Sequence, residues 1–305
     1  MKKIGYRLLR EENGNVSLIV AGGMVVFLLF LALVADVGML YVRQQKLQNA
    51  LDAGVLAGIQ KIIYSKAEAE ETARFYVQSN GAGSFGVEAD PAKLTISADG
   101  EETVSLSFAK IMGVNASHVR ADAKARAGTT VAMTGLVPIG VPDQTFKYGQ
   151  LYELSEEAGE GYSGNYGFLD LGGGGASALT NNIRYGYEGE IEVGDKIPTK
   201  TGINHGPVKG AIQFRMDQDI DRSECQSYQT ADRSCHRIMF LPVIDSLDVN
   251  GKKPVTVLGF AAFFLEGTEG SGGDMIITGR FLRMVTPGEL GSGKNYGVYS
   301  VKLTE

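Results

Sequence analysis

The chain has 305 residues, of which 44% are hydrophobic and 21% are charged, and its formal net charge is −6. This composition is typical of a folded protein with a substantial core, and it argues against intrinsic disorder. The negative balance also argues against a nucleic-acid binder, which needs basic side chains to neutralise phosphates. The 41 glycines predict many turns and loops, as in a β-rich domain.

The first predicted element is a membrane-spanning helix over the uncharged run Val16–Ala35. At 1.5 Å per residue such a helix is about 30 Å long, which matches the hydrocarbon core of a bilayer. Asp36 follows the run, whereas basic residues precede it: Lys2, Lys3, Arg7 and Arg10. The positive-inside rule therefore predicts that residues 1–15 are cytoplasmic and that the C-terminal domain lies outside.

Two alternatives to this membrane anchor remain open. A cleaved signal peptide would leave a secreted protein, but its hydrophobic region is usually about 7–15 residues, shorter than this run. Leu33 and Ala35 also make a poor cleavage pattern before Asp36. A buried helix of a soluble protein would normally have a polar face. We therefore expect a single-pass protein of the cell membrane, with the lipid bilayer as its first partner.

The same helix is predicted to continue over residues 36–64 as a stalk, because no proline interrupts residues 1–90. A continuous helix from Val16 to Ile63 would be about 70 Å long. Apolar residues recur there at helical spacing and form one stripe: Leu40, Leu47, Leu51, Val55, Ile59 and Ile62. This stripe packs either on the protein's own globular domain or on another subunit, and both can hold on different faces.

A row of small residues runs beside the stripe: Ala50, Ala53, Gly54, Ala57 and Gly58. Small side chains allow another backbone to come close. We therefore predict that these are helix-packing residues.

Residues 65–130 are predicted to form a small α+β module. Residues 66–79 are rich in good helix formers. Asp99-Gly100 lies between two alternating runs, Leu94–Ser97 and Glu102–Phe108, and predicts a hairpin turn. From Val119 to Ala127, alanines alternate with charged residues, which predicts a strand whose thin apolar face allows a helix to pack closely.

Residues 131–305 are predicted to form a β-rich extracytoplasmic domain, so the expected fold class is α+β. Short helices are expected at Ala176–Tyr185 and Val208–Met216, and Asn250-Gly251 predicts a hairpin turn. The predicted strands are Thr130–Val141, Thr145–Leu154, Arg237–Ile244, Pro254–Glu266, Met275–Met284 and Tyr296–Leu303.

Motifs for catalysis or for cofactor binding are weak. The glycine run 172–175 lacks the Lys-Ser or Lys-Thr of a phosphate loop, so no nucleotide is expected. Asp217, Asp219 and Asp221 are spaced as calcium ligands can be. An EF-hand loop is excluded, because Arg222 and Tyr228 occupy the positions that need Gly and Glu. The segment is then either a solvated acidic loop or a calcium site of another kind. The histidines His118, His205 and His236 form no zinc motif. We expect no catalytic residue, cofactor or metal.

Cys225 and Cys235 are the two cysteines of the chain. Both lie on the side of the membrane where nothing keeps thiols reduced, so the pair predicts a disulfide. The intervening segment QSYQTADRS has no apolar run to hold it in place. Two free thiols are the alternative. A metal pair would need further ligands, and His236 is the one histidine close in sequence.

The N-terminal part resembles the TadE/TadG-like family of the bacterial Flp (tight adherence) pilus-assembly system. The matching residues are Gly14-Asn15-Val16, the apolar span, Ala35-Asp36-Val37-Gly38, Leu40-Tyr41, Leu47-Gln48-Asn49-Ala50, Asp52-Ala53 and Leu56-Ala57-Gly58. Residues 104–108, 111–114 and 119–127 also resemble family members, so the resemblance covers about residues 13–128. It implies a non-catalytic pilus-assembly component or minor-pilin-like subunit that contacts other subunits through the helix after Asp36.

One position departs from processed prepilins, which usually carry Glu five residues after the cleaved glycine. Counted from Gly14, this position is Ile19. A permanent anchor therefore fits better than a polymerising major pilin. Two other classes stay open: a membrane-anchored binding module for cell wall, carbohydrate or metal that is unrelated to pili, and a membrane-tethered enzyme.

Overall fold

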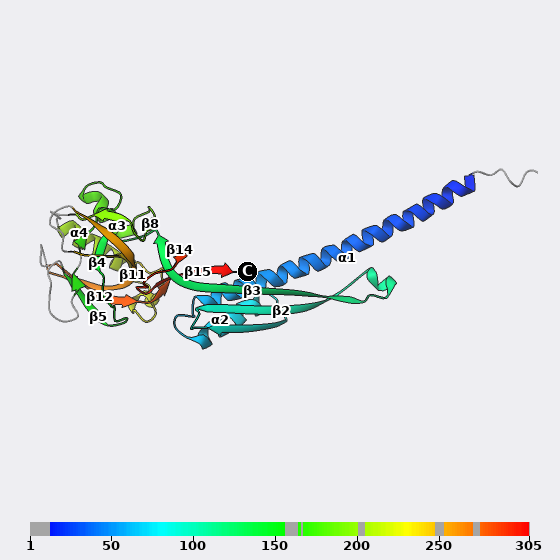
Figure 1. Ribbon diagram of the computed structural model, residues 1–305, viewed down its shortest axis with the longest axis horizontal. Coiled ribbons are helices and arrows are strands. Elements are labelled where there is room, and N and C mark those ends of the chain that lie inside the picture. Colours follow the sequence, from blue (N-terminus) through cyan, green and yellow to red (C-terminus); the bar gives the residue numbers. More distant parts are fainter. Residues whose placement is uncertain are drawn as a thin grey trace, which may run out of the picture.

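The structure is a computed structural model that describes residues 13–155, 164–165, 167–200, 205–247, 253–270 and 275–304. It confirms a mixed α+β fold with a long apolar helix at its N-terminal end and a β-rich C-terminal region (Figure 1). Residues 1–12 and the predicted turn at Asn250-Gly251 lie outside the described residues.

Helix α1 (Asn13–Ile59) is continuous, and its N-terminal half extends away from the rest of the protein (Figure 1). The helix ends earlier than the predicted Ile63. The backbone N–H groups of Lys61 and Ile62 donate to the carbonyls three residues before them, at Gly58 and Ile59, which tightens the last turn and stops the helix.

The part of the protein nearest the exposed helix is an α+β layer built on the second half of α1. Helix α2 (Lys66–Ser79) is capped by the Ser65 side chain, which accepts the N–H of Glu68. The adjacent sheet has the order β1-β2-β3-β15-β13, with β14 and β8 also paired to β3. Its strands are β1 (Ser84–Asp90), β2 (Thr95–Ser105), β3 (Ala116–Met133), β8 (Ile191–Glu192), β13 (Met284–Val285), β14 (Glu289–Gly291) and β15 (Val298–Thr304).

The predicted hairpin turn at Asp99-Gly100 is wrong. Both residues lie inside the continuous strand β2, where Asp99 pairs with Asp122 and Gly100 pairs with Ala121 of β3. Helix α1 packs directly over this point, and a Cβ on Gly100 would lie 3.2 Å from Leu47 Cδ1. The glycine therefore admits the helix rather than making a turn. The chain instead reverses after Asp90, whose carboxylate accepts the N–H groups of Ala92 and Lys93.

The end of the chain returns to the first sheet. Strand β15 pairs antiparallel with β3 from Tyr299↔Thr129 to Thr304↔Lys124, and Figure 1 shows the C-terminus beside α1. The predicted boundary at residue 130 falls inside β3, which extends to Met133. The two regions are therefore joined by shared strands and not only by a linker.

The distal region contains the second sheet, ordered β6-β5-β12-β11-β10-β4-β7, with β9 paired to β11. Its largest buried side chains include Phe168, Phe260, Phe263, Phe264 and Phe281. The strands are β4 (Ile139–Pro142), β5 (Leu151–Ser155), β6 (Gly164–Asn165), β7 (Gly167–Phe168), β9 (Lys196–Pro198), β10 (Ile238–Ile244), β11 (Pro254–Glu269) and β12 (Ile276–Leu282). Helix α3 (Ala176–Tyr185) has the predicted bounds, whereas α4 (His205–Gln218) is longer than predicted.

Candidate functional site

The N-terminal half of α1 is an apolar surface that the described part of the protein leaves almost entirely uncovered. Leu29 is 52% exposed and Phe30 is 62% exposed. Among the described helices, α1 is the one that is long and apolar enough to cross a membrane. None of its most apolar stretch is buried in the protein. Large apolar side chains on all faces of a helix are stable in lipid and not in water.

The C-terminal half of α1 is instead the spine of a protein core. Leu51, Val55 and Ile59 are fully buried, so the predicted apolar stripe faces the protein's own globular part. Opposite them, the outward face of β3 is charged and its inward face carries buried alanines, as the sequence predicts. The short alanine side chains bring the helix close enough for Gln44 and Gln48 to donate to the β3 carbonyls of Arg120 and Asp122.

The small residues of α1 separate into two groups in the structure. Ala50, Gly54 and Gly58 are buried, and the two glycines face α2. A Cβ on Gly54 would lie 2.2 Å from Val77 Cγ2, and one on Gly58 would lie 2.6 Å from the carbonyl oxygen of Ala69. These two positions therefore require glycine for α2 to approach α1.

Ala53 and Ala57 are only half-buried and do not belong to this close contact. At 100° per residue, Ala53 points away from the buried Leu51, on the same side as the exposed Val42, Asn49 and Gln60. We call Val42, Asn49, Ala53, Leu56 and Gln60 the outer face of α1. This outer face is available for contact with another protein.

Asp36 marks the border between the two halves of α1. Its side chain is buried, and its carboxylate accepts the N–H groups of Ser107, Phe108 and Ala109 at 2.8, 3.0 and 2.7 Å. These amides begin the short helix η1 (Ala109–Met112), which connects β2 to β3. A carboxylate bonded to three backbone amides is a strong, charge-assisted anchor. It fixes the end of the β2–β3 hairpin to α1.

Side chains from α2 occupy part of the outer edge of the first sheet. On the edge strand β1, the carboxylate of Glu70 accepts the N–H of Ala89 at 3.1 Å, and Arg74 donates to the carbonyl of Val87 at 2.9 Å. Unpaired edge strands invite pairing with other chains, and charged side chains on the edge prevent it. This edge is therefore a poor surface for strand addition.

A cleft of about 1220 Å³ lies between the α1–α2 turn and the distal region. The hydroxyl of Tyr64 donates to the carbonyl of Arg283 at 2.8 Å across it, and burial raises the pKa of Tyr64. The guanidinium of Arg283 lies 4.9 Å from the ring centre of Tyr148, and that of Arg280 lies 4.7 Å from the ring centre of Tyr228. One face of each of these two rings is thus covered by the protein's own arginine.

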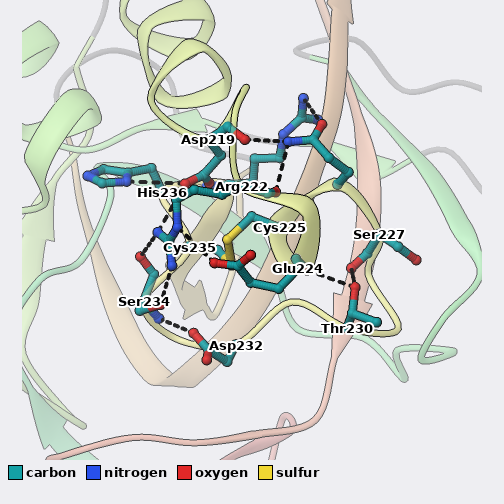
Figure 2. The surroundings of a disulfide bond; sticks show 12 residues. Asp219, Arg222, Glu224, Cys225, Ser227, Thr230, Asp232, Ser234, Cys235 and His236 are labelled. Atoms are coloured by element: carbon teal, nitrogen blue, oxygen red, sulfur yellow. Dashed lines mark hydrogen bonds and ion pairs between the residues drawn. A yellow bond between two sulfur atoms is a disulfide. The ribbon is translucent and has the colours of Figure 1, made fainter.

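In the distal region Cys225 and Cys235 are joined by a disulfide, with Cα atoms 5.5 Å apart (Figure 2). Cys225 lies on the short helix η2 (Ser223–Gln226), and both cysteines are buried. Beside them, Arg222 donates to the carbonyl and hydroxyl oxygens of Ser234 at 2.8 and 2.7 Å. The covalent bond and these hydrogen bonds close the same loop.

Two buried charged side chains order the backbone around this loop. Asp219 is fully buried, accepts the N–H of Arg237 at 2.8 Å and pairs with Arg222 at 3.3 Å (Figure 2). Arg215 on α4 donates to the carbonyls of Ile183, Arg184, His236 and Ile238. Burial lowers the pKa of Arg215 to about 10, so it remains charged at neutral pH.

The aspartates of the D-x-D-x-D motif do not converge on a calcium site. Asp219 is buried, Asp217 is exposed and accepts a hydrogen bond from Gln213, and Asp221 is exposed. Within the described residues, the one group of potential metal ligands combines Asp219 with Cys225 and Cys235. Because the two sulfur atoms are bonded to each other, they are not thiolate ligands in this structure.

The histidines and the glycine run have separate places in the fold. His118 lies on β3 beside Glu101, His205 begins α4, and His236 lies near Asp219. In the glycine run, the carbonyl of Gly174 accepts a hydrogen bond from Lys200 at 2.7 Å. The structure therefore does not bring these residues together.

Sequence reasoning missed three features: the anchoring role of Asp36, the buried Arg215, and the cleft beside Tyr64. For Asp36 a signal was present, because an acidic residue stood directly after the apolar run. Its partners lie more than seventy residues later, so only the fold could identify them.

Comparison with known proteins gives one family. Residues 14–69 match the model of the TadE/G-like Flp pilus-assembly family, which covers α1, its final turn and the start of α2. No curated protein and no solved structure matches the chain. The resemblance predicted for residues 70–128 remains a prediction. The N-terminal part of this chain, with its membrane-anchoring helix, thus matches the TadE/G-like family of Flp pilus-assembly proteins.

Proposed function

We propose that this chain is a non-catalytic, structural subunit of a Flp pilus-assembly system, held permanently in the membrane by α1 with its globular part outside the cytoplasm. The observation that carries the proposal is the division of α1 at Asp36. One continuous helix is apolar and uncovered before this residue and forms the spine of a folded module after it. The family match spans both parts.

The outer face of α1 is the proposed contact with other pilus-assembly subunits. Its centre, Ala53, is small and half-buried, and Val42 is 51% exposed beside the charged Lys46. A small residue between larger ones lets a second helix come close. Gly54 and Gly58 are already used by α2, so the outer face is the part of the small-residue row that is left for a partner.

Photo-crosslinking in cells tests this proposal. A photoreactive amino acid at Asn49, on the outer face, should form a crosslink to another pilus-assembly subunit. The same amino acid at Tyr185, which is 63% exposed on α3 of the distal region, is the matched control. Pili on the same cells should be counted with wild-type chain, with Ala53→Leu and without the chain.

The proposal expects fewer pili with Ala53→Leu although the variant is folded and in the membrane. Normal pilus numbers in cells lacking the chain would show that it has no part in assembly. Crosslinks from Tyr185 to the same subunit, with none from Asn49, would move the contact away from α1.

The cleft favours a second candidate, a membrane-anchored module that binds cell-wall carbohydrate. Tyr64, Tyr148 and Tyr228 line it, and aromatic rings are common in ligand sites. This candidate ranks second, because arginines already cover one face of the Tyr148 and Tyr228 rings and leave less aromatic surface for a sugar to stack on. Calorimetry with soluble peptidoglycan fragments tests it: heat of binding that is lost in Tyr148→Ala would favour this candidate, and no heat would exclude it.

A further inference from the structure

The turn between β2 and β3 carries apolar side chains that the described protein does not cover. Ile111 and Met112 are each 80% exposed, the highest values among the large apolar residues, and Val114 is 50% exposed. We call Phe108, Ile111, Met112 and Val114 the hairpin tip. Burying an apolar side chain contributes about 1.5–3 kcal/mol, so leaving these in water is unfavourable.

The hairpin tip lies beside the membrane-spanning half of α1. Figure 1 shows the β2–β3 turn reaching back along α1, away from the rest of the sheet. A groove of about 340 Å³ between the two is lined almost entirely by apolar residues, including Leu29, Phe30 and Leu33 of α1 and Ile111 and Met112 of the tip. The three N–H bonds to Asp36 hold the tip in this place.

This position determines where the tip lies relative to the membrane. Leu29 lies six residues before Ala35, the last residue of the apolar run, which is about 9 Å along the helix axis. A side chain that lines a groove with Leu29 and Phe30 is therefore at the depth of the hydrocarbon core whenever α1 spans the bilayer. The tip cannot stay in water while its neighbours on α1 are in lipid.

We propose that the hairpin tip inserts into the outer leaflet of the bilayer as a second membrane contact beside α1. Acyl chains of the lipid fill the groove and cover Ile111 and Met112. Lys110 is exposed on the same turn, and its long stem can lie along the apolar surface while the ammonium group reaches the headgroups. This inference rests on the membrane-spanning role of α1 and not on the proposed pilus partners.

The inserted tip would also fix the direction of the globular part. A single helix allows a domain to tilt and turn above the membrane, whereas two contacts joined by Asp36 restrict both motions. The outer face of α1 would then be presented at a constant height above the lipid.

The absence of tryptophan from the sequence allows a direct test with single-tryptophan variants of the full chain. Met112→Trp and Ile111→Trp report on the tip, Phe30→Trp on α1, and Ile220→Trp on an exposed apolar position of the distal region. Each variant is placed in phosphatidylcholine vesicles with and without bromine atoms on the acyl chains. Bromine quenches only tryptophans within the hydrocarbon region.

The proposal expects Met112→Trp and Ile111→Trp to lose fluorescence in brominated vesicles to an extent comparable with Phe30→Trp, and their emission to shift to shorter wavelength. Ile220→Trp should show neither effect. Quenching at Phe30 without quenching at the tip would overturn the inference and leave the anchor intact. A shift at the tip without quenching would show that protein covers it, which also overturns the inference. No quenching at Phe30 would overturn both.

Discussion

The two halves of α1 are one helix in two environments. Before Asp36, apolar residues cover every face and the described protein leaves almost all of them exposed. After Asp36, one apolar stripe is fully buried at Leu51 and Val55, and polar and charged residues share the other faces. The first half carries no charged residue, whereas Asp36, Arg43, Lys46 and Asp52 lie in the second half. A helix surrounded by lipid can be apolar all round, whereas a helix on a sheet needs only one apolar face.

The largest expected contrast comes from the same substitution in each half. Leu51→Ala should destabilise the folded module by about 2–5 kcal/mol, because it removes a fully buried side chain and leaves a cavity. Leu29→Ala should leave the thermal unfolding of the full chain in detergent unchanged, because the described protein leaves Leu29 52% exposed and detergent can cover the position in both variants. Equal losses of stability at the two positions would mean that the halves are packed alike.

The second prediction separates the α1 module from the distal region. Replacing both Cys225 and Cys235 with Ser should destabilise the distal region by about 2–3 kcal/mol, because the unfolded chain gains the conformational entropy that the closed loop had removed. Hydrogen exchange of the amides in α1 and α2 should not change. Denatured, unreduced wild-type protein should offer no thiol to a labelling reagent, and two reactive thiols would show that the bond does not form in the cell.

The third prediction uses the two groups of small residues. Gly58→Leu should cost about 1–3 kcal/mol, because the new side chain meets the backbone of Ala69 on α2. Ala53→Leu introduces the same side chain on the outer face and should change stability little. Thermal unfolding of both variants measures the difference, and a larger loss at Ala53 would reverse our assignment of the two faces.

The smallest expected effect is local, at the border between the halves. Asp36→Asn keeps the shape of the side chain but replaces one acceptor oxygen by an NH2 donor and removes the charge. At least one of the three bonds from backbone amides is therefore lost and the others weaken, which should cost about 1–2 kcal/mol in total. Amide exchange should become faster at Ser107, Phe108 and Ala109 and stay constant in the distal region. Asp90→Asn is the control, because Asp90 also accepts loop amides but at an exposed site.

Local patterns predicted the elements that depend on neighbours in sequence. The stripe on α1, the alternating strand around Ala123 and the bounds of α3 all follow from periodicity and from flanking glycines. The turn at Asp99-Gly100 failed for the opposite reason, because a helix more than forty residues earlier packs on Gly100 and overrides the local turn preference. The return of β15 to β3 is likewise a long-range pairing.

Cysteine accessibility on either side of Asp36 tests the central claim most directly. Val42→Cys and Leu29→Cys each add one thiol to a chain whose native pair is bonded. A membrane-impermeant maleimide is added to intact spheroplasts. The account predicts that Val42→Cys is labelled from outside and that Leu29→Cys is protected in intact and lysed samples alike. Labelling of Val42→Cys only after lysis would contradict the orientation, and ready labelling of Leu29→Cys would contradict its place in the membrane.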